Sequence, residues 1–243
     1  MRLTERKILI SGGGSGIGLA LARSLAAGNR VVIAGRDEAK LEQASVGVPR
    51  LETLRLDVTD ERDAVRAMGW VGEHFGGLDL LVNSAGVMAS GAFDDPGAEL
   101  AAAQDVEINL LGTIRITRLA LLMLRASDDG AVVMLSSALA LVSSPQMAVY
   151  AATKAAVHSL ARSLRAELSG AVKVFDVLPP WVQSDLSRDV RGPKITPDQV
   201  AGAIVHGMQR DRFEIRVGRI KQLVAIGRIS PRLADSIAAR ATR

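Results

Sequence analysis

A short apolar strand pattern that leads directly into a run of glycines constrains this chain more than any other stretch. Lys7–Gly18 reads KILISGGGSGIG, and an alanine-rich apolar helix pattern follows over Ile17–Ala27. Strand, glycine turn and helix in this order are the context in which free N–H groups at a helix N-terminus bind dinucleotide phosphates. The spacing is G-x-x-x-G-x-G rather than the commoner G-x-G-x-x-G, so a plain flexible turn is the alternative.

Apolar runs of strand length alternate with helix patterns along the rest of the chain. This alternation predicts an α/β fold: a single-domain, doubly wound (Rossmann-type) parallel sheet of about seven strands flanked by helices. We find no linker or repeat within residues 1–218, so we expect one dinucleotide-binding catalytic domain there. The expected strands cover residues 7–11, 30–34, 51–56, 78–82, 131–135, 172–178 and 213–217, and the expected helices cover 17–27, 38–44, 61–75, 99–124, 150–168 and 197–208.

Composition excludes several classes of protein. The 243 residues contain no cysteine, and the three histidines (His74, His158 and His206) lack metal-ligand spacing, so we expect no metal site. No apolar run reaches the length of a membrane span, and the N-terminus lacks a signal-peptide pattern. The net charge of +4 comes from scattered arginines, which favours a solvated surface over a nucleic-acid footprint. We therefore expect a cytoplasmic protein.

The tail Arg219–Arg243 forms the second expected unit. Apolar residues alternate with Arg and Lys, and Pro231 divides the pattern in two. Such a basic amphipathic segment could lie on a membrane surface, or it could pack on the domain or on a second subunit. We favour packing.

The end of the second expected strand bears on the choice of cofactor. In a dinucleotide fold this point lies beside the adenosine ribose, where an acidic residue binds the 2′-hydroxyl of NAD and an Arg accommodates the 2′-phosphate of NADP. Gly35 leaves room and Arg36 supplies a guanidinium suited to phosphate, so we favour NADP(H). Asp37 could be the acidic partner instead, or the N-cap of the helix that follows.

Polar or small residues also follow the third and fourth expected strands. Asp57 and Val58 follow the third, where Asp57 could reach an adenine or start a helix turn. Asn83, Ala85 and Gly86 follow the fourth, where small residues allow a ligand to approach closely and Asn83 could brace the neighbouring strand.

A tyrosine and a lysine four residues apart carry the expected chemistry. Tyr150, the only tyrosine, and Lys154 share one helix face, and Ser137 follows the fifth expected strand. A nearby ammonium favours phenolate and would lower the pKa of Tyr150 toward the working pH, as a tyrosine general acid/base requires. Asn109 lies in the apolar middle of the helix expected at 99–124, either as a structural hydrogen-bonder or as part of a proton path.

These residues together resemble the short-chain dehydrogenase/reductase family from Lys7 to about Val217. Ser11–Gly18 is similar to its T-G-x-x-x-G-x-G cofactor loop, with Ser in place of Thr, and Asn83–Gly86 is similar to its N-N-A-G, with Ser84 as a departure. Pro179–Ser184 stands where the family has P-G-x-x-x-T, with Pro180 and Ser184 as departures. The strand Phe213–Gly218 and the tail resemble a DltE-like bacterial branch.

The resemblance implies a role for each catalytic residue. Tyr150 would give or take the proton of the carbonyl or alcohol oxygen, and Ser137 would hold that oxygen. Lys154 would hold the nicotinamide ribose and lower the pKa of Tyr150, and Asn109 would anchor a water that links Lys154 to solvent. The residues expected to bind NADP(H) are Ser11, Gly12, Gly14, Ser15, Gly16, Ile17, Gly18, Arg36, Asp57, Val58, Asn83, Ala85, Gly86, Tyr150, Lys154, Pro179, Val182 and Ser184.

We therefore expect an NADP(H)-dependent oxidoreductase that interconverts a ketone and a secondary alcohol. A catalytically silent NADP(H)-binding sensor or scaffold on the same fold is the alternative. The resemblance also implies a homodimer or homotetramer. Apolar residues after the motifs suggest a lipophilic substrate pocket, with plain core packing as the alternative: Val87, Met88, Leu139, Leu141, Val142, Met147 and Trp181.

Overall fold

Parallel strands form one central sheet in the computed structural model, which describes residues 1–142 and 144–218. The strand order is β3-β2-β1-β4-β5-β6-β7, and every neighbouring pair is parallel. The predicted doubly wound sheet of about seven strands is therefore confirmed. The strands are β1 (Lys7–Ser11), β2 (Arg30–Gly35), β3 (Leu51–Arg55), β4 (Leu80–Asn83), β5 (Ala131–Leu135), β6 (Lys173–Leu178) and β7 (Glu214–Arg216).

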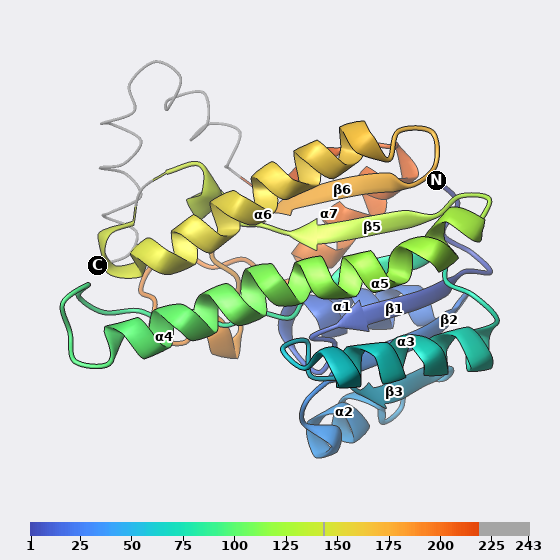
Figure 1. Ribbon diagram of the computed structural model, residues 1–243, viewed down its shortest axis with the longest axis horizontal. Helices are drawn as coiled ribbons and strands as arrows, with labels where there is room; N and C mark the ends of the chain where they lie inside the picture. The colour runs from blue at the N-terminus through green and yellow to red at the C-terminus, as the bar shows by residue number, and fades with distance from the viewer. Residues whose placement is uncertain (143, 219–243) are drawn as a thin grey trace.

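Helices cover both faces of this sheet, with α3, α5 and α6 in front of it and α1 and α7 behind it in Figure 1. The α-helices are α1 (Gly16–Ala26), α2 (Glu38–Ser45), α3 (Glu61–Phe75), α4 (Ala98–Asp105), α5 (Thr113–Ala126), α6 (Ala148–Glu167) and α7 (Pro197–Gln209). The short 3₁₀ turns are η2 (Ala138–Ala140), η3 (Pro145–Met147) and η4 (Asp185–Ser187).

Alternate residues of each strand enter two separate cores, because successive side chains of a strand point to opposite faces. In β1, Ile8 and Ile10 pack into the core beneath α1 and α7. Leu9 packs into the other core, beneath α3, α5 and α6. Both faces are dry, as the nearly continuous apolar strand runs require of a parallel sheet.

The helix expected over residues 99–124 contains a π-helical segment. It comprises α4, then η1 (Val106–Gly112), then α5, with Asn109 inside η1. A π segment makes i→i+5 hydrogen bonds and often marks a functional site. Periodicity alone did not reveal this change of winding.

Three further features concern the segment before α7, the question of a membrane-spanning helix, and the C-terminal tail. Residues 184–196 form an irregular segment, apart from the single turn η4. No helix in the described ranges is both long and apolar enough to cross a membrane. The tail Arg219–Arg243 lies outside the described residues, so its role and the domain boundary at 218 stay predictions.

Candidate active site

The predicted site residues converge at the carboxyl ends of the strands, the edge at which open α/β sheets bind ligands. The glycine loop follows β1, Ser137 follows β5, and Tyr150 and Lys154 lie in the first two turns of α6. Asn109 approaches from η1. In Figure 1 the strand arrowheads, α4 and the start of α6 all lie toward the same end of the molecule.

Two glycines are required by close packing of the loop after β1. Gly12 has φ +68°, and a Cβ there would lie 2.5 Å from Ala85 N. A Cβ on Gly18 would lie 2.5 Å from Gly12 O. Because backbone atoms stand at both points, no larger residue fits, and the loop is a tight turn rather than the flexible turn that the sequence left open.

The N-terminus of α1 is open toward the site. Ser15 is the N-cap residue, but its side chain makes no capping hydrogen bond. Cβ atoms on Gly14 and Gly16 would meet only side chains, at 3.4 Å from Leu41 and 3.5 Å from Ser184. Because the helix start has unpaired N–H groups and room above it, Ser15, Gly16, Ile17 and the turn before them fit a bound phosphate.

Arg36 and Asp37 take different roles at the end of β2. Asp37 is the N-cap of α2, and its carboxylate accepts the backbone N–H of Lys40 at 3.0 Å. Arg36 is exposed and makes no ion pair within the described part of the chain. The guanidinium is thus the charged group left for a ligand at this point.

Asp57 starts a turn, which is one of the two roles that the sequence allowed. Its Oδ1 accepts the N–H and the hydroxyl of Thr59, at 2.9 and 2.7 Å. Val58 is buried, and its carbonyl accepts a hydrogen bond from Arg115. The contact of Asp57 and Val58 with a cofactor stays a prediction.

The residues after β4 are tied to the glycine loop and to α5. Ser84 donates its N–H to Ser11 O at 3.1 Å, and Ala85 donates to Ser11 Oγ at 3.5 Å. Asn83 is buried and donates to Thr117 Oγ1 on α5 at 2.9 Å. The Asn83 side chain therefore binds α5 rather than the neighbouring strand, which the sequence had suggested it could brace.

The segment after β6 lies against the glycine loop. Val182 is buried and pairs with Ile195, and Pro179 O accepts the N–H of Ala138 at 3.0 Å. The Ser184 side chain is the one that a Cβ on Gly16 would approach. Ser184 therefore flanks the open helix start, and the contacts of Pro179 and Val182 with a cofactor stay predictions.

Tyr150, Ser137 and Lys154 form a buried polar group. A side-chain hydrogen bond joins Ser137 and Tyr150. Lys154 Nζ donates to Leu135 O at 2.9 Å and lies 5.6 Å from the centre of the Tyr150 ring. All three side chains are buried, so a proton can be exchanged here in a site that excludes water.

The pKa of Tyr150 moves opposite to the sequence expectation. Burial and the negative charge of Asp105 raise it, and only the Ser137 hydrogen bond lowers it. Burial lowers the pKa of Lys154 to about 8, against the effect of Asp105. The predicted lowering of the Tyr150 pKa by Lys154 is wrong for this geometry, because desolvation outweighs an ammonium that points to Leu135.

Asn109 binds the backbone that leads away from the cofactor loop. Its Oδ1 accepts the N–H of Val87 and its Nδ2 donates to Val87 O, both at 2.9 Å. Nδ2 also donates to Thr153 Oγ1 at 3.3 Å. The Asn109 side chain is therefore a structural hydrogen-bonder, and its predicted water contact is untested.

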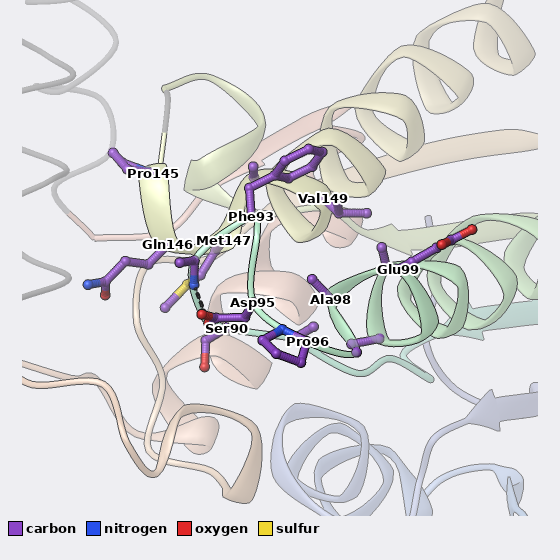
Figure 2. A pocket seen from close by; sticks show the side chains of 17 residues that line it. Ser90, Phe93, Asp95, Pro96, Ala98, Glu99, Pro145, Gln146, Met147 and Val149 are labelled. Carbon is purple, nitrogen blue, oxygen red and sulfur yellow. Dashed lines mark hydrogen bonds between the residues drawn. The ribbon is translucent and has the colours of Figure 1, made fainter.

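A cavity of about 490 Å³ lies between residues 89–102 and residues 145–149, which directly precede Tyr150 in the chain. Figure 2 shows Phe93, Met147 and Val149 around it, with Asp95 and Glu99 as its carboxylates. Met147 lines it, as the sequence predicted. Leu139, Met88, Val142 and Trp181 instead pack around Tyr150, the core role that the sequence left open.

Sequence reasoning missed four polar residues. Asp105 is fully buried and its charge acts on Tyr150 and Lys154. Thr153 holds Asn109, and Lys40 pairs with Asp185 at 3.2 Å beside the glycine loop. Asp105 precedes Asn109 by four residues in an alanine-rich helix, a spacing that could have revealed it. Lys40 and Asp185 are too far apart in sequence to be paired without the fold.

Comparison with known proteins gives one consistent family. The model of the short chain dehydrogenase family matches residues 6–194. A relative from Bacillus subtilis (strain 168), named uncharacterized oxidoreductase DltE, is 33% identical over 232 residues, which cover 92% of each chain. The predicted family and DltE-like branch are confirmed.

Solved structures agree over the whole chain. A short chain dehydrogenase from Burkholderia cenocepacia J2315 in complex with NADP has a TM-score of 0.86 and 28% identity, with all of both chains covered. A short chain dehydrogenase/reductase from Burkholderia phymatum in complex with NAD also has a TM-score of 0.86, with 25% identity over 100% of this chain and 99% of that one. The two neighbours thus carry different nicotinamide cofactors.

Proposed function

The chain belongs to the short-chain dehydrogenase family, and we propose that it is an NADP(H)-dependent oxidoreductase that interconverts a ketone and a secondary alcohol. The observation that carries this proposal is the buried group of Tyr150, Ser137 and Lys154 beside an open, uncapped helix start. The buried polar group can exchange a proton, and the helix start can bind a phosphate. When bound, the cofactor supplies the hydride.

In the proposed reduction, Tyr150 donates its proton to the substrate oxygen as hydride reaches the carbonyl carbon. The Ser137 hydroxyl, already bonded to Tyr150, holds that oxygen. The phenolate then regains a proton, and Lys154, whose pKa of about 8 lies near working pH, is the group suited to pass it on. In oxidation the same groups act in reverse.

The choice of NADP(H) rests on the end of β2. Arg36 is exposed while Asp37 caps α2, so a guanidinium is left to pair with a 2′-phosphate. The two structural neighbours carry NADP and NAD, so the choice depends on Arg36 alone.

Calorimetry of NADPH and NADH binding tests the cofactor proposal. We expect NADPH to bind more tightly, and we expect Arg36→Ala to weaken NADPH binding by about tenfold or more while leaving NADH unchanged. Equal affinity for both cofactors in the wild-type protein would contradict the proposal.

Reduction of a panel of lipophilic ketones tests the reaction. Tyr150→Phe should abolish turnover and keep cofactor binding, because the ring stays and only the proton donor is lost. Full activity in this variant would exclude the mechanism. Cofactor binding with no turnover of any ketone by the wild-type protein would favour a silent sensor.

We further propose that the protein forms a homodimer or homotetramer. Three apolar side chains of the η1–α5 run, Leu111, Ile114 and Leu122, are exposed, and Leu122 is 82% accessible. Such a row is typical of an interface between copies. Light scattering on the purified full chain would show a single monomer mass if this is wrong.

A further inference from the structure

One buried carboxylate near the catalytic group has no part in the proposed reaction. Asp105, the last residue of α4, is fully buried. It accepts the N–H of Ala89, at 3.1 Å to Oδ1 and 3.3 Å to Oδ2. In the described parts of the chain no Lys, Arg or His lies within ion-pair distance of it. A charge held in the interior at this cost calls for an explanation.

Asp105 and Asn109 together bind one extended stretch of backbone. Asn109 holds both the N–H and the carbonyl of Val87, and Asp105 holds the N–H of Ala89. Residues two apart in an extended chain present their N–H groups on the same side. The two side chains of this helical run therefore replace a neighbouring strand for residues 87–89.

This stretch connects the catalytic group to the cavity. At one end, a Cβ on Gly86 would lie 3.7 Å from Lys154 Nζ and 3.0 Å from Asn109 Oδ1. At the other end, Ala89 lines the cavity, whose wall continues through Ser90 in Figure 2. Asp105 is therefore in a position to affect both the shape of the cavity and the charge near Lys154.

Few other charges face Asp105. Among the described residues, Tyr150 and Lys154 face it from α6, and residues 84–90 include no charged side chain. On its own helical run, Glu107 pairs with Arg115 at 3.2 Å and Glu99 lies at the cavity wall. Burial raises the pKa of Asp105 to about 6, while the Ala89 hydrogen bond and Lys154 oppose that rise, so the carboxylate is ionised at neutral pH.

We infer that Asp105 is a positioning residue of the proposed reaction, whose carboxylate fixes the cavity wall through Ala89 and places a negative charge beside Tyr150 and Lys154. The charge favours the protonated form of Lys154, and Lys154 is the group suited to return a proton to Tyr150. This role rests on the proposed function, but its electrostatic part can be measured without a substrate.

The test follows Lys154, whose pKa of about 8 lies in a range where the folded protein can be titrated. Asp105→Asn keeps an oxygen to accept the Ala89 N–H and removes the charge. The Lys154 Cε resonance, measured by NMR on the full-length protein and assigned with Lys154→Met, should titrate with a pKa about one unit lower than in wild type. Glu107→Gln removes a carboxylate on the same helical run that is paired with Arg115, and it should leave the Lys154 titration as in wild type.

An unshifted titration in folded Asp105→Asn would overturn the inference. If that variant does not fold, Asp105→Ser, which keeps a hydroxyl acceptor, gives the same comparison with the same two outcomes. In steady-state assays the pH above which reduction declines should also fall in Asp105→Asn, and Asp105→Ala should in addition raise KM. A shifted titration in a protein that reduces no ketone would sink the proposed function and leave the charge effect standing.

Discussion

Lys154 and His158 lie one turn apart on the same side of α6, and their pKa values shift in opposite directions although burial lowers both. Among the described residues Lys154 Nζ hydrogen-bonds to a single backbone carbonyl, and burial lowers its pKa to about 8. His158 Nδ1 lies 2.5 Å from Asp176, and this hydrogen bond raises the pKa of His158 although burial opposes it. The contacting partner, rather than the depth of burial, decides which base stays charged.

The two serines after β5, Ser136 and Ser137, also differ in their hydrogen-bond partners. Ser136 donates to Asp176 Oδ1 at 2.5 Å and to Val177 O at 2.9 Å. Ser137 is bonded to Tyr150. Ser136, Asp176 and His158 thus form a satisfied network behind the site, while Ser137, Tyr150 and Lys154 keep capacity for a ligand. We infer that the first set stabilises the fold, and we assign the second set to the proposed reaction.

The largest expected effect on stability comes from disrupting the network of Ser136, Asp176 and His158. Asp176→Asn leaves a half-buried imidazolium without its anion, and we expect a loss of about 3–5 kcal/mol in the free energy of unfolding. In wild type the contribution of His158 is fully present below its unfolded pKa of 6.5 and is lost as pH rises through the raised folded pKa. The variant should lose this pH dependence. Urea titrations at several pH values measure both quantities.

Asp189→Asn, a change to an exposed carboxylate, is the matched control and should leave stability unchanged. If Asp176→Asn unfolds at the wild-type urea concentration, the ion pair is not a stabilising element and the comparison fails.

A smaller effect of opposite sign is expected at Lys154. Below the folded pKa of about 8 the cost of burying its charge is fully present, and between that pKa and 10.5 the unfolded state binds more protons, so stability rises with pH. Lys154→Met removes this cost at neutral pH together with the Leu135 hydrogen bond. We expect a gain of up to about 3 kcal/mol in the free energy of unfolding, with loss of turnover.

The stability gain from Lys154→Met should shrink when unfolding is measured again at about pH 10. A variant less stable than wild type at neutral pH would mean that Lys154 is held by interactions beyond its contact with Leu135.

The smallest expected stability effect separates the two serines. Ser136→Ala should cost about 1–2 kcal/mol and leave the catalytic rate close to wild type, because its bonds go to Asp176 and Val177. Ser137→Ala should lower kcat/KM by about a hundredfold and change stability by less than about 1 kcal/mol, since it removes a donor to the substrate oxygen. Equal losses of kcat/KM in both variants would contradict the separate roles of the two serines.

Much of the fold could be predicted because it depends on local patterns. Apolar runs of strand length and helix periodicity predicted every strand of the sheet, most of them within a residue or two. Strand–glycine–helix order indicated the open start of α1, and the four-residue spacing of Tyr150 and Lys154 placed both on one face of α6. The catalytic roles of these residues stay predictions.

The parts that could not be predicted depend on residues that meet only in the fold. Asp57 accepts hydrogen bonds within its own turn, and Asn83 donates to α5. The local sequence around each residue is equally compatible with other partners, so these contacts could not be predicted. The π segment around Asn109 left no trace in the apolar periodicity. Lys40 and Asp185 approach each other from distant parts of the chain.

The sequence by itself determined the α/β class, the strands and helices, and the set of polar residues carried to one edge of the sheet, because these follow from spacing along the chain. Only the tertiary structure decided the strand order and the proton affinities at the site. The pKa of Tyr150 rises rather than falls because it depends on how completely neighbouring segments bury the phenol, and on a carboxylate, Asp105, that reaches it across the packed interior.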